Sequence, residues 1–435
     1  MAYNAIVAKI SALDPHPNAD RLQIATVLYN KVIVGLDQKV GDIGVFFEPD
    51  GQLSPEFCEA NNLLRKKDLV TGKQIGGFFE ENRRIRALKL RGVKSDGYWT
   101  SLKSLEFTGH DLSKLKEGDQ LCELNGVKIC NKYYTKATRQ SQGQNKTKMN
   151  RRETIWFPMN DDTEHLFKFI HTICEDDLVF LTEKFHGTSQ RMSFNLDLQD
   201  LPFQFLRRNY NQLASLIRLP KCLLQKPEYT YLYGSRRVIL NHSDNPGYYG
   251  DNAFRYKVAA PLKDKIHKGE VWYYEIVGWV NENTPIMPPH DMTKLGPDYT
   301  KQYGETIYYK YGQPLGQADL YVYRITSINP DGVVIDLPWN LVKKRCREVG
   351  VKYVPELHPP ILCGSRFQDE LMELVKKLAD GPSLADSSHI KEGCCCRVER
   401  ANGEMDIYKY KSTDFKILEG ILKENSDMVD PEDVA

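Results

Sequence analysis

The first fifty residues contain four short apolar segments, each closed by residues that favour turns. The segments read NAIVAKISAL, QIATVLY, KVIVGL and IGVFFEP, and they are rich in valine, isoleucine and phenylalanine. Short strands at such close spacing predict a small all-β barrel or sandwich, because each strand needs paired neighbours for its backbone. We expect this domain to occupy residues 1–130.

A chain of 435 residues is longer than one typical domain, so a second folded domain is expected. We place it at residues 153–424, after a basic linker at 131–152 and before an acidic tail at 425–435. The linker holds seven Lys or Arg and no acid, which would favour phosphates, although a merely soluble linker has the same composition. Because the formal net charge is only +1, any nucleic-acid surface must be local.

The sequence has no apolar run near the roughly 18 residues that a membrane helix needs, and its start does not resemble a signal peptide. We therefore expect no membrane partner and a cytoplasmic location, with the nucleus as the alternative. The ten cysteines are scattered. The run Cys394–Cys396 lacks the spacing of a zinc site and is more typical of small buried residues in a reducing compartment.

The segment RIRALKLRGVKSDGYW alternates in a way that predicts a strand with Arg84, Arg86, Lys89 and Arg91 exposed. A solvated strand face is the ordinary explanation for such charges. Together with the earlier turn DPHPNADRL, however, the segment resembles the oligonucleotide-binding (OB) modules appended to some aminoacyl-tRNA synthetases. That resemblance implies that the three arginines bind RNA, since OB folds grip single strands with a basic groove and aromatic platforms.

Lys184 ends the apolar segment DDLVFLTEK, and Gly187 follows it where the backbone can approach a ligand closely. A K-x-x-G tetrapeptide occurs by chance in most chains of this length. Its weight comes from the residues that follow in order, each on a segment rich in β-formers: Arg236, Glu275, Tyr323, Glu392, Lys409 and Lys411. Alone, each has an ordinary explanation, as a sheet carboxylate, a core aromatic or a solvated strand face.

As an ordered set, these residues resemble the covalent nucleotidyltransferases, which include RNA ligases, DNA ligases and mRNA capping enzymes. The resemblance implies an α+β fold, with an antiparallel-sheet nucleotidyltransferase domain (an ATP-grasp-like ligase core) after the OB domain. It also implies that Lys184 carries AMP and that Glu275 and Glu392 hold Mg²⁺ or Mn²⁺. Lys184, Lys409 and Lys411 would be catalytic. The implied ATP-binding residues are Glu183, Lys184, Gly187, Arg236, Glu275, Tyr323, Glu392, Lys409 and Lys411.

Some features depart from the usual pattern. His186 stands where many DNA ligases and capping enzymes have Asp, and it is similar to the K-x-H-G form of some RNA ligases. Arg191 lies two residues beyond the usual arginine. Residues 200–228 are expected to be helix-rich extra material, and residues 281–305 an inserted loop.

Domain order separates the relatives. DNA ligases and capping enzymes carry their OB domain after the catalytic core, but only 24 residues follow Lys411 here. An N-terminal OB domain resembles the RNA ligases typified by Deinococcus and Naegleria enzymes. This implies a monomeric, ATP-dependent ligase for RNA repair that joins 3′-OH and 5′-phosphate ends at a nick or a break. The alternatives are another nucleotidyltransferase, such as a DNA ligase or a GTP-dependent capping enzyme, or a non-catalytic tRNA-binding protein.

Overall fold

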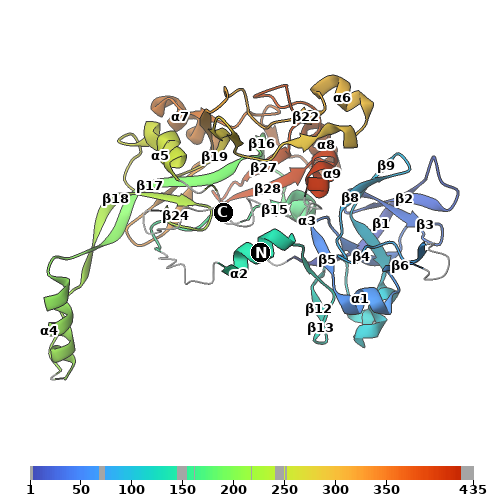
Figure 1. The fold of residues 1–435 in the computed structure, drawn as a ribbon, viewed down its shortest axis with the longest axis horizontal. Helices are drawn as coiled ribbons and strands as arrows, with labels where there is room; N and C mark the ends of the chain where they lie inside the picture. The colour runs from blue at the N-terminus through green and yellow to red at the C-terminus, as the bar shows by residue number, and fades with distance from the viewer. Residues whose placement is uncertain are drawn as a thin grey trace.

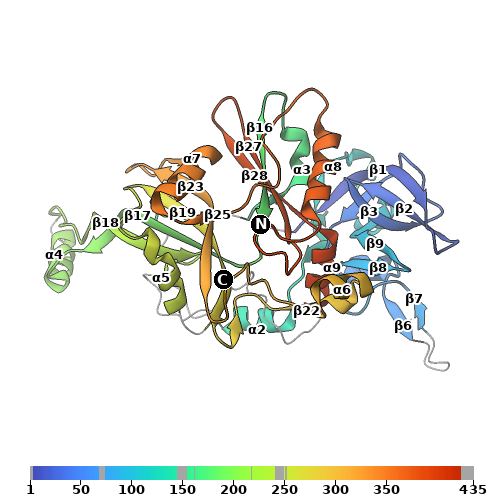
Figure 2. The same cartoon turned by 90° about the horizontal axis from the view of Figure 1, so that it is seen from above.

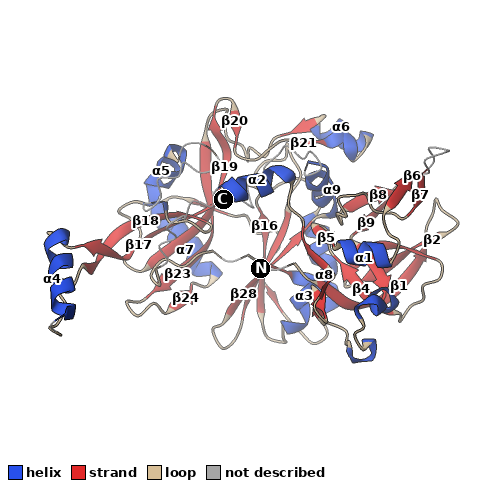
Figure 3. Cartoon of the chain, turned by 60° about the horizontal axis from the view of Figure 1, so that its bottom comes forward, coloured by secondary structure: helices blue, strands red, loops and turns tan. Residues whose placement is uncertain are grey.

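The computed structural model describes residues 3–67, 74–144, 154–160, 162–216, 218–240, 249 and 252–422. The expected acidic tail at 425–435 and residues 145–152 of the expected linker lie outside the described residues. The chain has the predicted α+β architecture, with a β-rich N-terminal domain followed by a larger domain built on two mainly antiparallel sheets (Figure 1). Strands dominate both parts, and short helices lie around them (Figure 3).

The N-terminal domain is organised around one long strand, β1 (Ala5–Pro15). Its first half pairs with β4 and β11 and its second half with β2, and the register shifts between Ile10 and Ala12. Such a bulge bends a strand, so one strand can serve two parts of a curved sheet. The sheet order is β10-β4-β1-β2-β3 with β11 on β1, where the partners are β2 (Leu22–Val27), β3 (Asn30–Gly35), β4 (Ile43–Phe47), β10 (Tyr98–Ser101) and β11 (Gln120–Leu121).

Smaller elements complete this domain. They are β5 (Gly51–Leu53), α1 (Pro55–Ala60), β6 (Arg65–Lys67), β7 (Gln74–Gly76), β8 (Ala87–Leu90), β9 (Val93–Asp96), η1 (Leu102–Thr108), η2 (Leu112–Lys114), β12 (Glu123–Leu124) and β13 (Val127–Lys128). The expected linker begins differently from the prediction. β14 (Cys130–Lys132) pairs with β5, and α2 (Lys136–Gln144) follows, so the described part of that segment is a strand and a helix.

The first sheet of the second domain has five strands in the order β15-β28-β27-β16-β26. Its strands are β15 (Glu164–His165), β16 (Leu178–Lys184), β26 (Ile361–Leu362), β27 (Gly393–Glu399) and β28 (Met405–Lys411). A second sheet has the order β18-β17-β19-β23-β24, with β20 on β19 and β25 on β23. It contains β17 (Thr188–Asp200), β18 (Gln225–Ser235), β19 (Glu270–Asn281), β20 (Thr284–Pro285), β23 (Ala318–Ile328), β24 (Val334–Asp336) and β25 (Lys352–Tyr353).

Short helices and a small strand pair complete the second domain. The helices are α3 (Leu166–Phe169), η3 (Ile170–Thr172), α4 (Gln204–Leu216), α5 (Ala253–Ala259), η5 (Ala260–Leu262), η6 (Met292–Lys294), α6 (Pro297–Tyr303), α7 (Trp339–Val349), α8 (Gln368–Ala379) and α9 (Thr413–Leu422), and the strand pair is β21 (His290–Asp291) with β22 (Thr306–Ile307). Within the described ranges, no helix is long and apolar enough to cross a membrane.

The two expected insertions differ in character. Residues 200–228 contain the predicted helix, α4, at the far end of an arm formed by β17 and β18 (Figures 1 and 2). Residues 281–305 are not a plain loop. They include β20, β21, η6 and α6, because their turn residues separate short segments that pair or coil.

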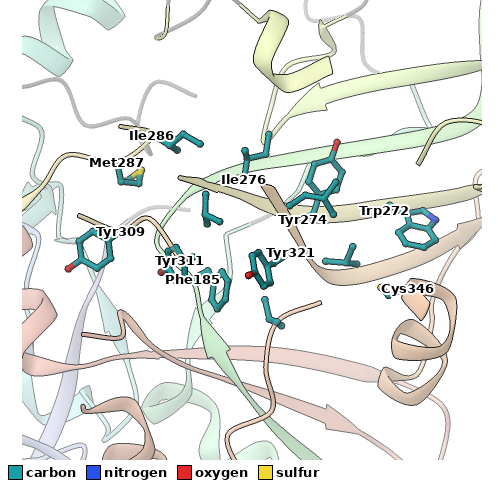
Figure 4. Packing of buried hydrophobic residues seen from close by; sticks show 14 of the residues in the cluster. Phe185, Trp272, Tyr274, Ile276, Ile286, Met287, Tyr309, Tyr311, Tyr321 and Cys346 are labelled. Carbon is teal, nitrogen blue, oxygen red and sulfur yellow. The ribbon is translucent and has the colours of Figure 1, made fainter. Parts of the chain in front are cut away.

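Two apolar clusters position the site. One lies in the second domain except for Ala87 of the N-terminal domain, and in it the Phe185 ring stacks on Tyr311 with centroids 4.2 Å apart and also contacts Tyr321 at 4.6 Å (Figure 4). The other cluster crosses the domain boundary. There the ring of Phe46 in the N-terminal domain meets Phe167 of the second domain edge-on, with centroids 6.2 Å apart. The two domains that frame the cavity therefore share this second apolar cluster.

Candidate active site

A cavity of about 800 Å³ opens between the N-terminal domain and the two sheets of the second domain. Its walls include eight of the nine residues expected to bind ATP: Glu183, Lys184, Gly187, Arg236, Glu275, Tyr323, Lys409 and Lys411. The ninth, Glu392, lies directly behind this wall, with its side chain fully buried. The structure thus gathers residues that are up to 228 positions apart in the chain, from Glu183 to Lys411.

Three strands bring Lys184 and Lys411 onto one carboxylate. Lys184 of β16 is opposite Gly393 of β27, which is opposite Lys411 of β28. Glu392 Oε1 lies 2.7 Å from Lys184 Nζ and 3.1 Å from Lys411 Nζ. A side chain at Gly393 does not fit between the strands, since a Cβ there would stand 2.0 Å from the carbonyl oxygen of Tyr410. The glycine therefore permits the close strand approach on which this arrangement depends.

Gly187 serves a similar purpose at the edge of the second sheet. A Cβ at this position would stand 2.4 Å from the carbonyl oxygen of Ile276 and 2.8 Å from Cγ of Glu275. The turn between β16 and β17 thus packs directly on β19. This places the Glu275 side chain beside the turn that follows Lys184, and both residues line the cavity.

Tyr323 is held in place through its hydroxyl group. Its Oη lies 2.8 Å from Ser189 Oγ and accepts a hydrogen bond of 2.6 Å from Asn160 Nδ2. Burial raises the pKa of Tyr323, and the nearby Glu275 raises it further, so the hydroxyl stays protonated at neutral pH. With the hydroxyl fixed, the ring is a rigid face at the cavity wall, suited to stacking on a flat base.

Arg236 lies where the arm returns to the cavity, and its guanidinium contacts Asp162 Oδ1 at 2.5 Å. The role of Arg191 could not be assigned from the sequence. In the structure its side chain is fully buried against the backbone of Ser235 and Arg236. Its Nη1 donates hydrogen bonds to the carbonyl oxygens of Ser235 and Arg236, and its guanidinium lies 4.5 Å from the ring of Phe157. Burial lowers the pKa of Arg191 to about 10. Arg191 therefore positions Arg236 and does not face the cavity.

The side chains of Glu183 and His186, near Lys184, are directed elsewhere, although Glu183 also lines the cavity. The Glu183 carboxylate accepts a hydrogen bond of 2.9 Å from the backbone N–H of Leu384, as expected for a side chain alternating with Lys184 along a strand. His186 is buried among Tyr309, His290 and Phe415, and its Nδ1 stands 3.9 Å from Glu392 Oε2. The histidine thus supports the far side of Glu392 without lining the cavity.

The exposure predicted for Arg84 is wrong. This residue precedes β8, and its buried side chain bonds to the Gly420 carbonyl oxygen at 2.7 Å and to Asp50 at 3.0 Å, where the N-terminal domain meets α9. Arg86 is half-buried and lies 3.5 Å from Glu80, whereas Arg91 is exposed in the turn after β8. None of the three lines the cavity.

The two OB-like motifs do meet in space. Asn18 in the first donates a hydrogen bond of 2.9 Å to the carbonyl oxygen of Arg91 in the second, and His16 Nε2 lies 3.3 Å from the carbonyl oxygen of Leu90. Each motif therefore fixes the loop of the other. The exposed Arg91 lies in the second of these two contacting loops.

The described residues contain no cluster of three His, Cys, Asp or Glu side chains that could hold a metal ion by themselves. Glu275 faces the cavity and offers hard oxygen ligands of the kind Mg²⁺ and Mn²⁺ accept. Glu392 is different, since two lysine amines lie on its Oε1. A divalent ion here fits an open site, held by few carboxylates and completed by phosphate oxygens and water.

Several cavity residues were missed by the sequence reasoning. They are Glu48, Asn160, Asp162, His165, Lys168 and Lys416. These residues precede Lys184 or follow Lys411, outside the ordered set. Ser189, which stands where many DNA ligases and capping enzymes have an arginine, also lines the cavity. No local pattern marks Glu48, which arrives from the other domain.

Comparisons with known proteins agree with this geometry. The family model for RNA ligases matches residues 177–411, more than half of the chain, and a model of an OB-fold domain matches residues 4–102. No curated protein sequence matches the chain.

Solved structures of Naegleria gruberi RNA ligase share the fold. A mutant without ligand has a TM-score of 0.56 at 16% identity, and the match covers 98% of this chain and 100% of that one. A mutant with ATP and Mn has the same score and identity and covers 98% and 99%, and a complex with pyrophosphate matches at 15% identity with a TM-score of 0.56. The predicted OB domain and ligase core are thus confirmed, and the chain belongs to the RNA ligase family.

Proposed function

We propose that this RNA ligase uses ATP and a divalent metal to join an RNA 3′-OH end to a 5′-phosphate end through a lysyl-AMP intermediate. One observation carries the proposal. The Lys184 amine lies 2.7 Å from the buried carboxylate of Glu392, at the wall of the cavity. The other residues of the ordered set line this cavity, except Glu392, which lies behind its wall. The solved Naegleria structures with ATP and Mn, and with AMP and Mn, support the choice of nucleotide and metal.

In the first step, the Lys184 nitrogen loses a proton and forms a bond to the α-phosphorus of ATP, and the bond from that phosphorus to the α,β-bridging oxygen breaks to release pyrophosphate. Lys409 and Lys411, which share one face of β28, stabilise the negative charge that builds on the phosphate oxygens. Tyr323 would stack on the adenine and Arg236 would bind the ribose or a phosphate. A divalent ion held by Glu275, and by Glu392 once its lysines have moved, would neutralise phosphate charge.

The next two steps use the same chemistry on RNA. An oxygen of the RNA 5′-phosphate attacks the phosphorus of lysyl-AMP, so the P–N bond breaks, Lys184 regains a free amine and a 5′,5′-pyrophosphate link forms. The RNA 3′-OH then attacks the 5′-phosphorus, loses its proton and expels AMP. Positioning of the two ends dominates such reactions, and the N-terminal domain with Arg86 and Arg91 would contribute to it.

Covalent labelling tests the proposal. The full chain is incubated with α-³²P-labelled ATP or GTP and Mg²⁺ or Mn²⁺, then denatured and separated by electrophoresis. We expect label from ATP, none with Lys184→Ala, and wild-type labelling with Lys377→Ala, a change at an exposed lysine of α8. No label with any nucleotide would refute the ligase mechanism, and label from GTP alone would indicate capping chemistry.

The strands that are joined are tested separately. Nicked duplexes with RNA or DNA on each side of the break, and single-stranded RNA with the same ends, are compared as substrates. We expect sealing only with a 3′-OH and a 5′-phosphate, and with RNA at the break. Equal sealing of all-DNA nicks would contradict the RNA preference. Sedimentation would test the expected monomer.

A further inference from the structure

Glu48 belongs to the N-terminal domain, yet its side chain enters the wall of the catalytic cavity. It directly follows β4, and its Oε1 lies 2.5 Å from Lys168 Nζ of α3, while Oε2 lies 3.8 Å from His165 Nε2. Both members of the Glu48–Lys168 pair are nearly buried, with 12% and 10% of their side-chain surface exposed. The Glu48 carboxylate is thus largely shielded from water and lies among side chains of the second domain.

The surroundings of Glu48 are strongly basic. The register of β15 and β28 places His165 beside Lys409, and Lys416 of α9 lines the same cavity. Burial raises the pKa of Glu48, and the charges of Lys168, Lys409 and Lys416 oppose that rise. The charges of three ammonium groups therefore act on the Glu48 carboxylate. Lys416 has a second carboxylate partner, Asp96.

His165 contributes as a neutral group. Burial lowers its pKa well below the ordinary value, and the nearby Lys409 and Lys168 lower it further. At neutral pH its ring can donate one hydrogen bond without adding charge. A tight cluster of ammonium groups with one neutral donor is the composition that suits an anion carrying several acceptor oxygens.

The cluster is also aligned with the reaction centre. Lys409 and Lys411 are two residues apart on β28 and share a face, so their Cα atoms are separated by about 7 Å along the strand. Lys411 reaches the carboxylate that holds Lys184. The basic cluster thus adjoins, through Lys409 and Lys411, the carboxylate that holds the amine proposed to attack.

We propose that Lys168, His165, Lys409 and Lys416 form a phosphate-binding site and that Glu48 fills it until a phosphate group displaces its carboxylate. This inference rests on the proposed function of the cavity. The ligand is a phosphate group in one of two forms, inorganic pyrophosphate leaving ATP or the 5′-phosphate of the RNA. A phosphate brings more charge and more acceptor oxygens than one carboxylate, so it competes effectively for the same lysines.

The displacement is confined to one side chain. Phe46, two residues earlier, stays packed on Phe167, and Tyr29 keeps its 2.7 Å hydrogen bond to Asp369 across the same domain boundary. Glu48 must leave before a phosphate enters. The apparent affinity for phosphate is therefore the affinity of the open site multiplied by the fraction of molecules in which the site is open. Removal of the carboxylate charge should therefore tighten phosphate binding.

Isothermal titration calorimetry on the full chain tests this directly, with inorganic pyrophosphate, a 5′-phosphorylated oligoribonucleotide and the same oligonucleotide with a 5′-OH as probes. We expect Glu48→Gln to bind at least one phosphate probe several-fold more tightly than wild type, and Lys168→Met to bind it more weakly. The matched control is Tyr29→Phe, which removes an interdomain hydrogen bond away from the cavity and should bind like wild type.

The three probes separate the two sources of phosphate. A gain for pyrophosphate alone identifies the ATP-derived group, and a gain for the 5′-phosphorylated but not the 5′-OH strand identifies the RNA end. Unchanged or weaker binding of both phosphate probes by Glu48→Gln would overturn the proposal, as would an equal gain in Tyr29→Phe. Failure of wild-type labelling by ATP would instead refute the proposed function, and the calorimetry would still report on the site.

Discussion

Lys184 and Lys411 lie on the same carboxylate oxygen, with their Nζ atoms 2.7 and 3.1 Å from Oε1 of Glu392. The two lysines are 227 residues apart in sequence and are neighbours only because β27 runs between their strands. A fully buried carboxylate between two ammonium groups fixes both amines at the cavity wall. The proposed nucleophile and one of the lysines proposed to stabilise charge therefore share one carboxylate contact.

The first prediction concerns that carboxylate. Glu392→Gln keeps the shape of the side chain and removes its charge, so the Lys184 ammonium loses the charged partner that orients it. We expect the rate of self-adenylylation to fall about 10²–10³-fold, the usual effect of deleting one preorganised electrostatic group. Single-turnover labelling with α-³²P-ATP measures the rate. Glu373→Gln on the exposed face of α8 is the control and should label at the wild-type rate, whereas normal labelling by Glu392→Gln would show that Lys184 is oriented by other groups.

The second prediction concerns Gly393. Gly393→Ala introduces a Cβ only 2.0 Å from the Tyr410 carbonyl oxygen, so β27 and β28 must move apart. We expect a loss of about 1–3 kcal/mol in the free energy of unfolding, as for other overpacked sites, together with loss of adenylylation. Chemical denaturation and labelling measure the two effects. Gly364→Ala, where a Cβ meets nothing within 4 Å, should change neither, and a stable, active Gly393→Ala would refute the steric argument.

The third prediction links stability to pH through Glu270. Burial acts to raise the pKa of this carboxyl, but hydrogen bonds from Arg345, the His267 N–H and the Trp272 indole outweigh it and leave the pKa lowered. A lowered carboxyl pKa stabilises the fold above the ordinary value of 4.5, and this stabilisation is lost as the pH falls through the folded-state pKa.

Arg345→Met removes the partner of that carboxylate and leaves a buried charge uncompensated. We expect it to lower the free energy of unfolding by about 3 kcal/mol at pH 7. The difference from wild type should shrink as the pH falls below 4.5, because protonated Glu270 no longer needs the arginine. Urea unfolding at a series of pH values measures it. A deficit that stays constant with pH would mean that lost packing, not charge, is responsible.

The fourth prediction separates the ring of Tyr323 from its hydroxyl. Tyr323→Phe keeps the ring but removes the contacts to Asn160 and Ser189, so ATP binding should weaken only slightly. Tyr323→Leu removes the stacking surface and should raise the KM for ATP in the labelling reaction about tenfold, the lower end of the range for one base–aromatic stack. Equal defects in both variants would assign the effect to the hydroxyl network.

The sequence was most informative where function depends on residue order along strands. Lys409 and Lys411 could be assigned to one face from alternation alone, and the ordered set from Lys184 to Lys411 predicted residues that the structure gathers at one cavity. Arg84 was misjudged because alternation does not show which face of a segment meets another domain. Glu48 was missed for the same reason, since its partners Lys168 and Lys416 come from a part of the chain that no local pattern connects to it.

The apolar cluster that joins Phe46 to Phe167 bears on how this enzyme can be divided and rebuilt. An OB domain tethered only by a linker could be exchanged for another RNA-binding module without harm to the catalytic half. Here the barrel supplies part of the hydrophobic interior behind the five-stranded sheet that carries Lys184 and Lys411, so its removal would leave that sheet open to water. The two domains therefore cannot be exchanged independently: a replacement barrel would need a matching apolar face as well as an affinity for RNA.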